Sequence, residues 1–272
     1  MDIIGRVLRW IGPASFPSNG RFLHHWIQSR DDEEQRIRAL PGGGKLRCNV
    51  SLPYEAMVWL RQEEEEDINV LRKLLAPGDV FIDCGANIGL WTIVASMQVG
   101  ATGAVYAFEP NPNTYSRLLE NIRLSEAGNI HSNQVAIGIE HGSAVFRCDT
   151  HHNSSHVKKE KTSDNDLEVP VRDLDAIIGE KKVSGIKVDV EGYEFEVLRG
   201  AEKLLKREKP WLSVEFNTKI AETRYLGDWS VHNYLSDIGY EARLFRNALS
   251  SNGALQKDRE FSGYCNLFYH SS

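Results

Sequence analysis

The chain has 272 residues, of which 41% are apolar and 26% charged, a size and balance that suit one large soluble domain with a short additional segment. The net charge is −6, and because no basic stripe is evident, a nucleic-acid partner is disfavoured and a small or neutral partner molecule is expected. The four cysteines (Cys48, Cys84, Cys148 and Cys265) have no metal-ligand spacing and are too few for a disulfide framework, so we expect a reducing, cytoplasmic location.

Residues 1–52 are mixed in composition, and we expect an N-terminal extension that caps a main domain at residues 53–272. The stretch 1–11 is amphipathic and is interpreted as a packing helix, with a weak membrane or partner contact as the alternative. It lacks the features of a signal peptide. No apolar run in the chain reaches the roughly 18 residues of a membrane span, so no stable membrane insertion is expected.

Apolar residues near 3.6-residue spacing predict a helical region over residues 53–75. Five acids at residues 63–67 interrupt this pattern. We interpret them as a solvated face or a helix start and assign them no chemical role.

Beyond Pro77-Gly78, predicted strands alternate with predicted helices. Strands are expected at residues 80–83, 104–108, 130–139 (with a bend), 184–190, 211–216, 240–245 and 264–269. Helices are expected at residues 90–99, 114–124, from the fourth strand to about 206, and 231–238, whereas residues 140–168 are polar and poorly patterned. This alternation predicts an α/β fold with a doubly wound, mostly parallel sheet of seven strands.

The first strand ends in a turn with the features of a ligand site. Ligands bind open parallel sheets beyond the C-terminal ends of the strands. Gly85 and Gly89 let the backbone turn tightly and approach a ligand. Glu109 ends the second strand, where an acid can accept hydrogen bonds from both hydroxyls of a ribose. These residues predict a nucleoside ligand, the alternative being an ordinary turn in which Asp83 caps the helix.

The turn differs from a nicotinamide fingerprint, because Asp83 occupies the position of the first glycine of G-x-G-x-x-G. An anion there would repel a diphosphate and would suit a ligand with a positive group, such as S-adenosylmethionine. A nicotinamide-dependent oxidoreductase is therefore a disfavoured alternative.

Five stretches resemble the FkbM family of class I S-adenosylmethionine-dependent methyltransferases: residues 77–89, 108–112, 135–138, 186–194 and 197–201. The resemblance covers about residues 54–216, and the Lys-x-Asp-x-Glu-Gly-x-Glu block beginning at Lys187 is its most distinctive part. It implies a Rossmann-like fold and O-methylation of sugars, polyketides or other secondary metabolites, without naming the acceptor. The cofactor-binding residues that we expect are Asp83, Gly85, Ala86, Asn87, Gly89, Glu109, Pro110, Asn111 and Val135. Tyr54 and Glu55 match a pair common in the family and either touch the methionine end of the cofactor or start a helix.

Alternation along the fourth strand places Lys187, Asp189 and Glu191 on one face. A buried Lys is costly unless it is paired, so this row forms either a structural ion network or part of the site. We expect Lys187 to pair with Glu215, on the neighbouring strand, or with Asp189.

An alcohol must lose its proton to be methylated, which requires a base. We predict Asp189 as the base. Glu191 is expected at a helix N-terminus, which favours its ionised form, and would orient the acceptor or, with Asp189, bind a divalent cation. The alternative is an ion network that only holds the sheet. His151, His152 and His156 are expected to be exposed, with a role as base or metal ligands as the alternative.

Two further alternatives remain. Methyltransferases that act on a nitrogen of nucleic acid or protein often carry Asn/Asp-Pro-Pro-Tyr/Phe after the fourth strand, where this chain has Asp189-Val190-Glu191-Gly192. A non-enzymatic scaffold would be expected to lose Asp83, the glycines or Glu109. The favoured prediction is an O-methyltransferase for a small-molecule hydroxyl, with the oligomeric state left open.

Overall fold

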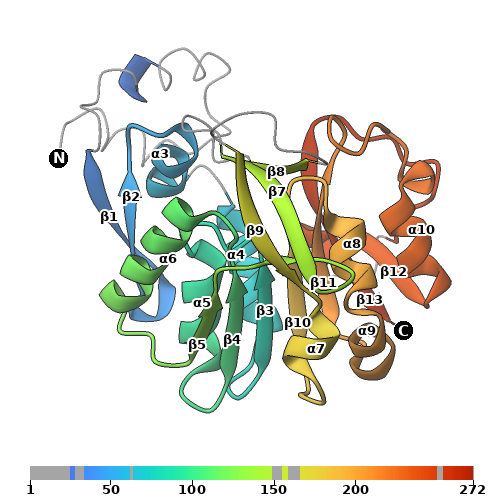
Figure 1. Ribbon diagram of the computed structural model, residues 1–272, viewed down its shortest axis with the longest axis horizontal. Coiled ribbons are helices and arrows are strands. Elements are labelled where there is room, and N and C mark those ends of the chain that lie inside the picture. Colours follow the sequence, from blue (N-terminus) through green and yellow to red (C-terminus); the bar gives the residue numbers. More distant parts are fainter. Residues whose placement is uncertain are drawn as a thin grey trace.

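The computed structural model describes residues 25–27, 34–61, 64–148, 155–158, 166–249 and 254–271 (Figure 1). Its strands are β1 (Gln35–Ala39), β2 (Lys45–Asn49), β3 (Val80–Cys84), β4 (Ala104–Phe108), β5 (Ile130–Asn133), β6 (Ala136–Ile137), β7 (Gly142–Cys148), β8 (Ser155–Lys158), β9 (Asp166–Arg172), β10 (Gly185–Val188), β11 (Trp211–Asn217), β12 (Tyr240–Leu244) and β13 (Tyr264–Ser271). Its α-helices are α3 (Pro53–Leu60), α4 (Glu65–Leu74), α5 (Leu90–Val99), α6 (Pro112–Leu124), α7 (Leu174–Ile178), α8 (Glu194–Arg199), α9 (Glu202–Glu208) and α10 (Ser230–Asp237), with short 3-10 turns η2 (Pro41–Gly43), η3 (Leu226–Asp228) and η4 (Phe245–Asn247).

A seven-stranded sheet in the order β12-β13-β11-β10-β3-β4-β5 forms the centre of the molecule. β10, β3, β4, β5 and β11 pair in parallel, and β13 runs antiparallel to both of its neighbours. The order reverses between β3 and β10, which is where an open α/β sheet binds its ligands. The predicted fold class, a doubly wound and mostly parallel sheet of seven strands, is confirmed.

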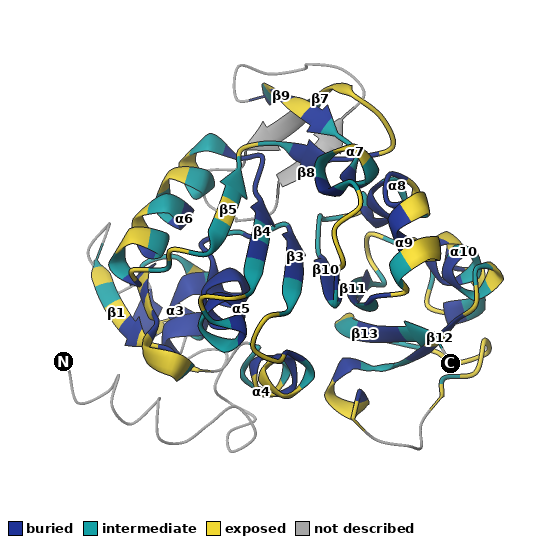
Figure 2. Ribbon diagram, turned by 90° about the horizontal axis from the view of Figure 1, so that it is seen from below, coloured by how far each residue is buried: buried dark blue, intermediate teal, exposed yellow. Residues whose placement is uncertain are grey.

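Helices cover both faces of this sheet, and each face has its own core (Figure 2). Phe81 and Val105 pack with α4 and α5 on one face, whereas Ile82 and Ile186 pack with α7, α8 and α9 on the other. Alternation therefore places Lys187 on the α5 side, away from its apolar neighbours on β10.

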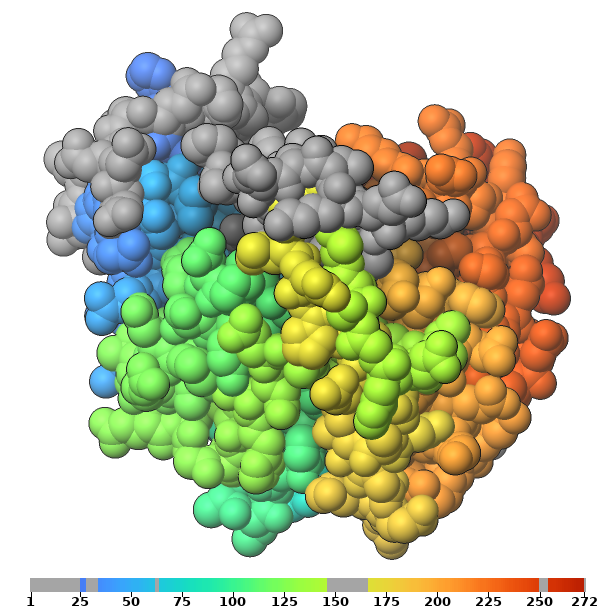
Figure 3. All heavy atoms as spheres, in the orientation of Figure 1, coloured from blue at the N-terminus to red at the C-terminus, as the bar shows by residue number. Residues whose placement is uncertain are grey.

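A second, four-stranded sheet in the order β6-β9-β7-β8 lies beside the main one. Figure 3 shows part of it on the molecular surface, between the green region of α6 and the orange C-terminal region. Residues 140–168, which are polar and poorly patterned in the sequence, contain β7, β8 and the start of β9, for which no strands were predicted. The predicted bent strand 130–139 is likewise two strands, β5 in the main sheet and β6 in the small one.

The helix expected to run to about residue 206 is broken into α8 and α9 at Gly200. A Cβ at Gly200 would lie 1.9 Å from the carbonyl oxygen of Gly138, so only glycine allows this close approach between the helix break and the loop after β6. The other predicted helices and strands are present with shifts of a few residues at their ends.

The N-terminal part that the structure describes is an antiparallel hairpin of β1 and β2. It is attached to α6, because Asn121 and Ser125 accept hydrogen bonds from the backbone of β2 at Arg47 and Lys45. The amphipathic stretch 1–11 lies outside the described residues, and the predicted boundary at residues 52/53 stays a prediction. None of the helices described is long and apolar enough to cross a membrane.

Candidate functional site

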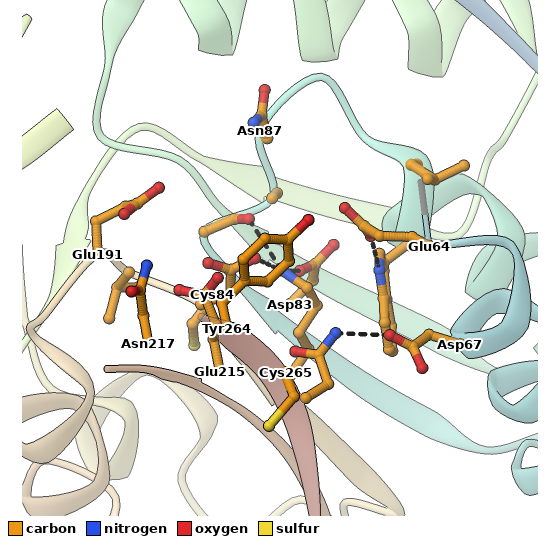
Figure 4. Close-up of a pocket in the computed structure, with 18 of the residues that line it drawn as sticks. Glu64, Asp67, Asp83, Cys84, Asn87, Glu191, Glu215, Asn217, Tyr264 and Cys265 are labelled. Carbon is orange, nitrogen blue, oxygen red and sulfur yellow. Dashed lines mark hydrogen bonds and ion pairs between the residues drawn. The ribbon is translucent and has the colours of Figure 1, made fainter. Parts of the chain in front are cut away.

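A cleft of about 1190 Å³ opens at the C-terminal ends of β3, β4, β10 and β11 (Figure 4). Residues of α3 and α4 form one wall, and residues around β13 close it from the other side. Among the described residues that line it, carboxylate side chains outnumber cationic ones ten to four. Such a lining attracts a positively charged ligand and repels a phosphate.

The turn after β3 lies at the bottom of this cleft. Gly85 has φ +82°, and a Cβ there would lie 1.8 Å from the carbonyl oxygen of Asp189. The glycine thus brings the turn against the end of β10. The backbone amides of Gly85 and Ala86 both donate to the carbonyl oxygen of Phe108, which ties the turn to the end of β4.

Glu109 joins two loops through its carboxylate. The amide of Asn87 donates to one oxygen at 2.9 Å and the amide of Asn111 to the other at 3.0 Å. Since an ionised carboxylate accepts about four hydrogen bonds, about two acceptor positions remain for a ligand with two adjacent hydroxyls. Burial raises the pKa of Glu109 to about 7, against the effect of both amides.

Lys187 is buried beneath the cleft and is surrounded by acids. Its Nζ lies 2.8 Å from Asp189 Oδ2 and 3.9 Å from Asp83 Oδ1, and it lies over the ring of Trp91. Burial lowers the pKa of the Lys187 ammonium, but Asp189, Asp83 and Glu64 outweigh burial and raise it above its usual value. Lys187 is therefore a permanent cation, and the predicted pairing with Asp189 is the one observed.

Asp83 is fully buried at the end of β3. Its Oδ2 accepts a 2.6 Å hydrogen bond from Thr92, but its Oδ1 accepts none from the residues described. Burial raises the pKa of Asp83, and Lys187 and Thr92 counteract this effect. The carboxylate thus has unused acceptor capacity beside the cleft.

Glu191 and Glu215 both line the cleft, after β10 and on β11 respectively (Figure 4). Burial raises the pKa of Glu191 to about 7, with help from Asp189 and Glu194. Burial and the same acids raise the pKa of Glu215 well above its usual range. The expectation that a helix N-terminus lowers the basicity of Glu191 is wrong, because α8 begins only at Glu194 and Glu191 lies in the preceding turn with φ 55°.

Most of the predicted site residues line this one cleft: Asp83, Gly85, Ala86, Asn87, Glu109, Pro110, Val135, Lys187, Asp189, Glu191 and Glu215. Gly89 and Asn111 lie behind it, where they begin α5 and α6. Tyr54 lines the cleft, whereas Glu55 is buried behind it and pairs with Arg117. Pro53 opens α3, so the helix-start interpretation of Tyr54-Glu55 is confirmed.

Sequence reasoning missed the wall formed by α4 and β13. The acidic run does begin a helix, but Glu64 and Asp67 line the cleft instead of forming a solvated face. Trp91 and Tyr54 donate hydrogen bonds to Glu64, and Asn266 donates to Asp67 at 2.7 Å. In the sequence, the only indication of this wall is the run of acids at residues 63–67.

The predicted histidine alternative cannot be placed at the cleft. His151 and His152 lie outside the described residues, and of His156 only the backbone, in β8, is described. Among the described side chains, no group of three or more His, Cys, Asp or Glu is arranged to hold a metal ion.

Comparison with known proteins gives a match to the methyltransferase FkbM domain over residues 83–242. Methyltransferase 1 of Beauveria bassiana is 31% identical over 46% of this chain and 59% of its own length. Hexuronic acid methyltransferase AglP of Haloferax volcanii is 28% identical over 55% of this chain and 62% of its own. A Schizosaccharomyces pombe protein named "Putative ribosomal RNA methyltransferase PB17E12.10c" is 28% identical over 57% and 51%, respectively.

The chain thus spans less than two thirds of the length of each of these relatives. Among solved structures, the FkbM methyltransferase of Methylobacillus flagellatus matches with a TM-score of 0.46 and 15% identity, over 79% of this chain and 65% of that one.

Proposed function

We propose that this chain, which belongs to the FkbM methyltransferase family, binds S-adenosylmethionine in the cleft and methylates a hydroxyl group of a small molecule. The observation that carries the proposal is that one cleft holds both Glu109, whose carboxylate has acceptor positions left for a diol, and Glu191, a weakly acidic carboxyl group.

The residues present fit the donor. The free acceptor positions of Glu109 suit the two hydroxyls of a ribose, and the unused oxygen of Asp83 and the acidic lining suit a positively charged ligand. When bound, S-adenosylmethionine supplies a methyl group that its sulfonium already activates. Much of the remaining task for the protein is to position the acceptor oxygen and remove its proton.

The cleft has room for an acceptor beside the donor, because about 1190 Å³ exceeds the roughly 300–1,000 Å³ of a pocket for one small ligand. Asp67, Asn217, Phe261 and Tyr264 also line the cleft and are not among the residues expected to bind the donor. Carboxylate, amide and aromatic groups of this kind suit a hydroxyl-rich acceptor such as a sugar. The hexuronic acid methyltransferase among the relatives supports a sugar acceptor.

The base that we propose is Glu191 rather than Asp189. Asp189 is engaged by Lys187 at 2.8 Å, whereas Glu191 forms no ion pair with the residues described and has a pKa of about 7. A base works best when its pKa lies near the working pH. Lys187 would then position Asp189 and the turn at Gly85, whose carbonyl oxygen accepts from its ammonium at 3.5 Å.

Calorimetry with S-adenosylhomocysteine tests the donor part of the proposal. Wild-type protein should bind it, Glu109→Ala should bind it more weakly, and Glu241→Ala, on the exposed face of β12, should match wild type. Binding of NADH without any response to S-adenosylhomocysteine would contradict the proposal.

A labelled-methyl screen tests the acceptor part. Sugars and other polyhydroxy compounds should accept label from the donor, and ribosomal RNA should not, because the acidic lining disfavours a phosphate chain. Label on RNA alone would overturn the choice of acceptor and leave donor binding intact.

A further inference from the structure

Glu64 is an acidic residue in the cleft to which the proposed reaction assigns no role. It precedes α4 with φ 59°, a left-handed backbone conformation that costs a non-glycine residue free energy. It lies outside residues 83–242, which match the methyltransferase domain. In Figure 4 its carboxylate points into the cleft, on the wall opposite Glu191.

Two neighbouring elements fix the carboxylate in place. Tyr54 Oη, on α3, donates to Glu64 Oε1 at 2.8 Å, and Trp91 Nε1, on α5, donates to the other oxygen. Both donors are neutral, so they orient the carboxylate without cancelling its charge. About two acceptor positions of the carboxylate remain for a ligand.

The charges around Glu64 are not balanced among the described residues. Lys187 is the cation at the centre of the cluster, and it attracts Asp189, Asp83 and Glu64. One ammonium cannot balance three carboxylates, and Asp83, which is fully buried, has an oxygen that accepts no hydrogen bond from the described residues. The unsatisfied buried oxygen indicates that a further hydrogen-bond donor completes this cluster, and the excess of acids favours a donor with a positive charge.

The shape of the cleft indicates which part of a bound ligand supplies this hydrogen-bond donor. In Figure 4, Asn87, whose backbone amide donates to Glu109, lies at the top of the cleft, and Glu64 lies on its right-hand wall. A nucleoside whose ribose reaches Glu109 would direct its far end toward Glu64. In the donor of the proposed function, this far end carries an ammonium group, which has three hydrogen-bond donors.

We propose that Glu64 binds the amino group of the methyl donor's amino-acid end and that its carboxyl group releases a proton when the donor binds. This inference rests on the proposed function. It assigns the specificity for a complete donor to the residue that precedes α4, in a segment before the matched domain.

The proton release follows from the surroundings of Glu64. Burial, with a smaller effect of Asp189, raises the pKa of Glu64 to about 7, although Lys187 and the hydrogen bonds from Tyr54 and Trp91 lower it. An ammonium beside the carboxylate lowers the pKa, so the fraction protonated at neutral pH is lost on binding. The other charged groups on this wall are Asp83 from β3, Arg61 after α3, and Glu65, Glu66 and Asp67 on α4 itself.

Calorimetry in buffers of different ionisation enthalpy, at pH 7, measures this release. Two ligands are compared: S-adenosylhomocysteine, which carries the ammonium, and 5′-methylthioadenosine, which lacks the amino-acid end. Wild-type protein should release protons with the first and fewer with the second. This comparison needs no variant, so it tests the proposal even if a substitution impairs folding.

Glu64→Gln keeps the size of the side chain and groups that can bond to Tyr54 and Trp91. It should weaken S-adenosylhomocysteine binding about 10- to 100-fold, the range for a lost charge-assisted hydrogen bond. Its affinity for 5′-methylthioadenosine should change less than about threefold, and the proton release should fall. Glu241→Gln, with the same change on exposed β12, should behave as wild type.

Equal weakening of both ligands would overturn the proposal, because Glu64 would then only shape the cleft. Unchanged affinity and unchanged proton release in Glu64→Gln would also overturn it, while the proposed function stands. If wild-type protein binds neither nucleoside, the proposed function fails, and this inference fails with it.

Discussion

The ammonium of Lys187 lies 2.8 Å from the carboxylate of Asp189, and this contact joins the buried end of β10 to the cleft. Lys187 is 4% exposed, whereas the side chain of Asp189 is 29% exposed. The pair therefore has one partner in the core and one in the site. A change at Lys187 should affect both stability and the position of the acid.

Lys187→Met tests the stability part of this relationship. It removes the only described cation beside two acids and leaves Asp83 buried without a counter-charge. Breaking a buried pair in this way costs about 3–5 kcal/mol, which urea denaturation measures. Lys206→Met, at an exposed pair with Glu202, is the control and should cost at most about 1 kcal/mol. Equal stability of the two variants would show that the acids do not depend on Lys187.

Gly85→Ala tests the close approach of the turn to Asp189. A Cβ would lie 1.8 Å from the carbonyl oxygen of Asp189, and φ is +82°. Gly43→Ala is a matched control, because Gly43 has φ +96° and open space around its missing Cβ. The left-handed backbone should lower the free energy of unfolding of both variants by about 1–2 kcal/mol. The steric conflict should lower that of Gly85→Ala by about 1–3 kcal/mol more. Thermal unfolding should show this order, and equal losses would mean that the turn can move away from β10.

Glu109→Gln tests the protonation of the buried carboxyl group. Its folded pKa of about 7 lies above the ordinary value of 4.5, so the folded state binds more protons than the unfolded state between these values. The stability that the protonated carboxyl contributes is complete below about pH 4.5 and is lost as pH rises through about 7. Glutamine does not titrate, so the melting temperature of Glu109→Gln minus that of wild type should increase from pH 5 to pH 8. A constant difference would indicate that Glu109 is ionised throughout.

Much of the fold follows from patterns that a sequence shows directly. β3, β4, β10 and β11 are short apolar runs bounded by glycine, proline or charged residues, and each is found within a few residues of its predicted place. The second sheet was missed for a physical reason. Among the side chains described, its core consists of Ala136, Val169 and Val171 with two partly buried neighbours, so the sequence offers little apolar alternation along β7 and β9.

The residues of the site likewise divide into those that sequence patterns predict and those that depend on tertiary packing. Residues at strand ends, such as Asp83, Glu109 and Asp189, can be expected in one cleft because parallel strands share an edge. Glu64 reaches the cleft only through packing between α4 and α5, which no local pattern encodes. The raised pKa of Glu191 depends equally on tertiary structure, because it results from burial and from acids brought close by the turn.

Substitution of the two acids after β10 tests the choice of base. Glu191→Gln should keep donor affinity and lower turnover about 10²- to 10⁴-fold, the usual size of a general-base contribution. Wild-type turnover should rise as pH increases toward about 7, because the base must lose its proton first. Glu180→Gln, which is almost fully exposed, is the control and should behave as wild type in both measurements.

Asp189→Asn should behave differently from Glu191→Gln, because it removes the partner of Lys187. We expect lower stability and weaker binding of S-adenosylhomocysteine together with lower turnover. A folded Asp189→Asn protein with normal donor affinity and no turnover, beside an active Glu191→Gln, would return the role of base to Asp189. Loss of wild-type activity on chelation, restored by Mg²⁺, would instead indicate that the two acids hold a divalent cation, and both substitutions should then be equally damaging. Turnover with a hydroxyl acceptor from the labelled-methyl screen, measured across pH 5–9 with and without chelator, separates these three outcomes.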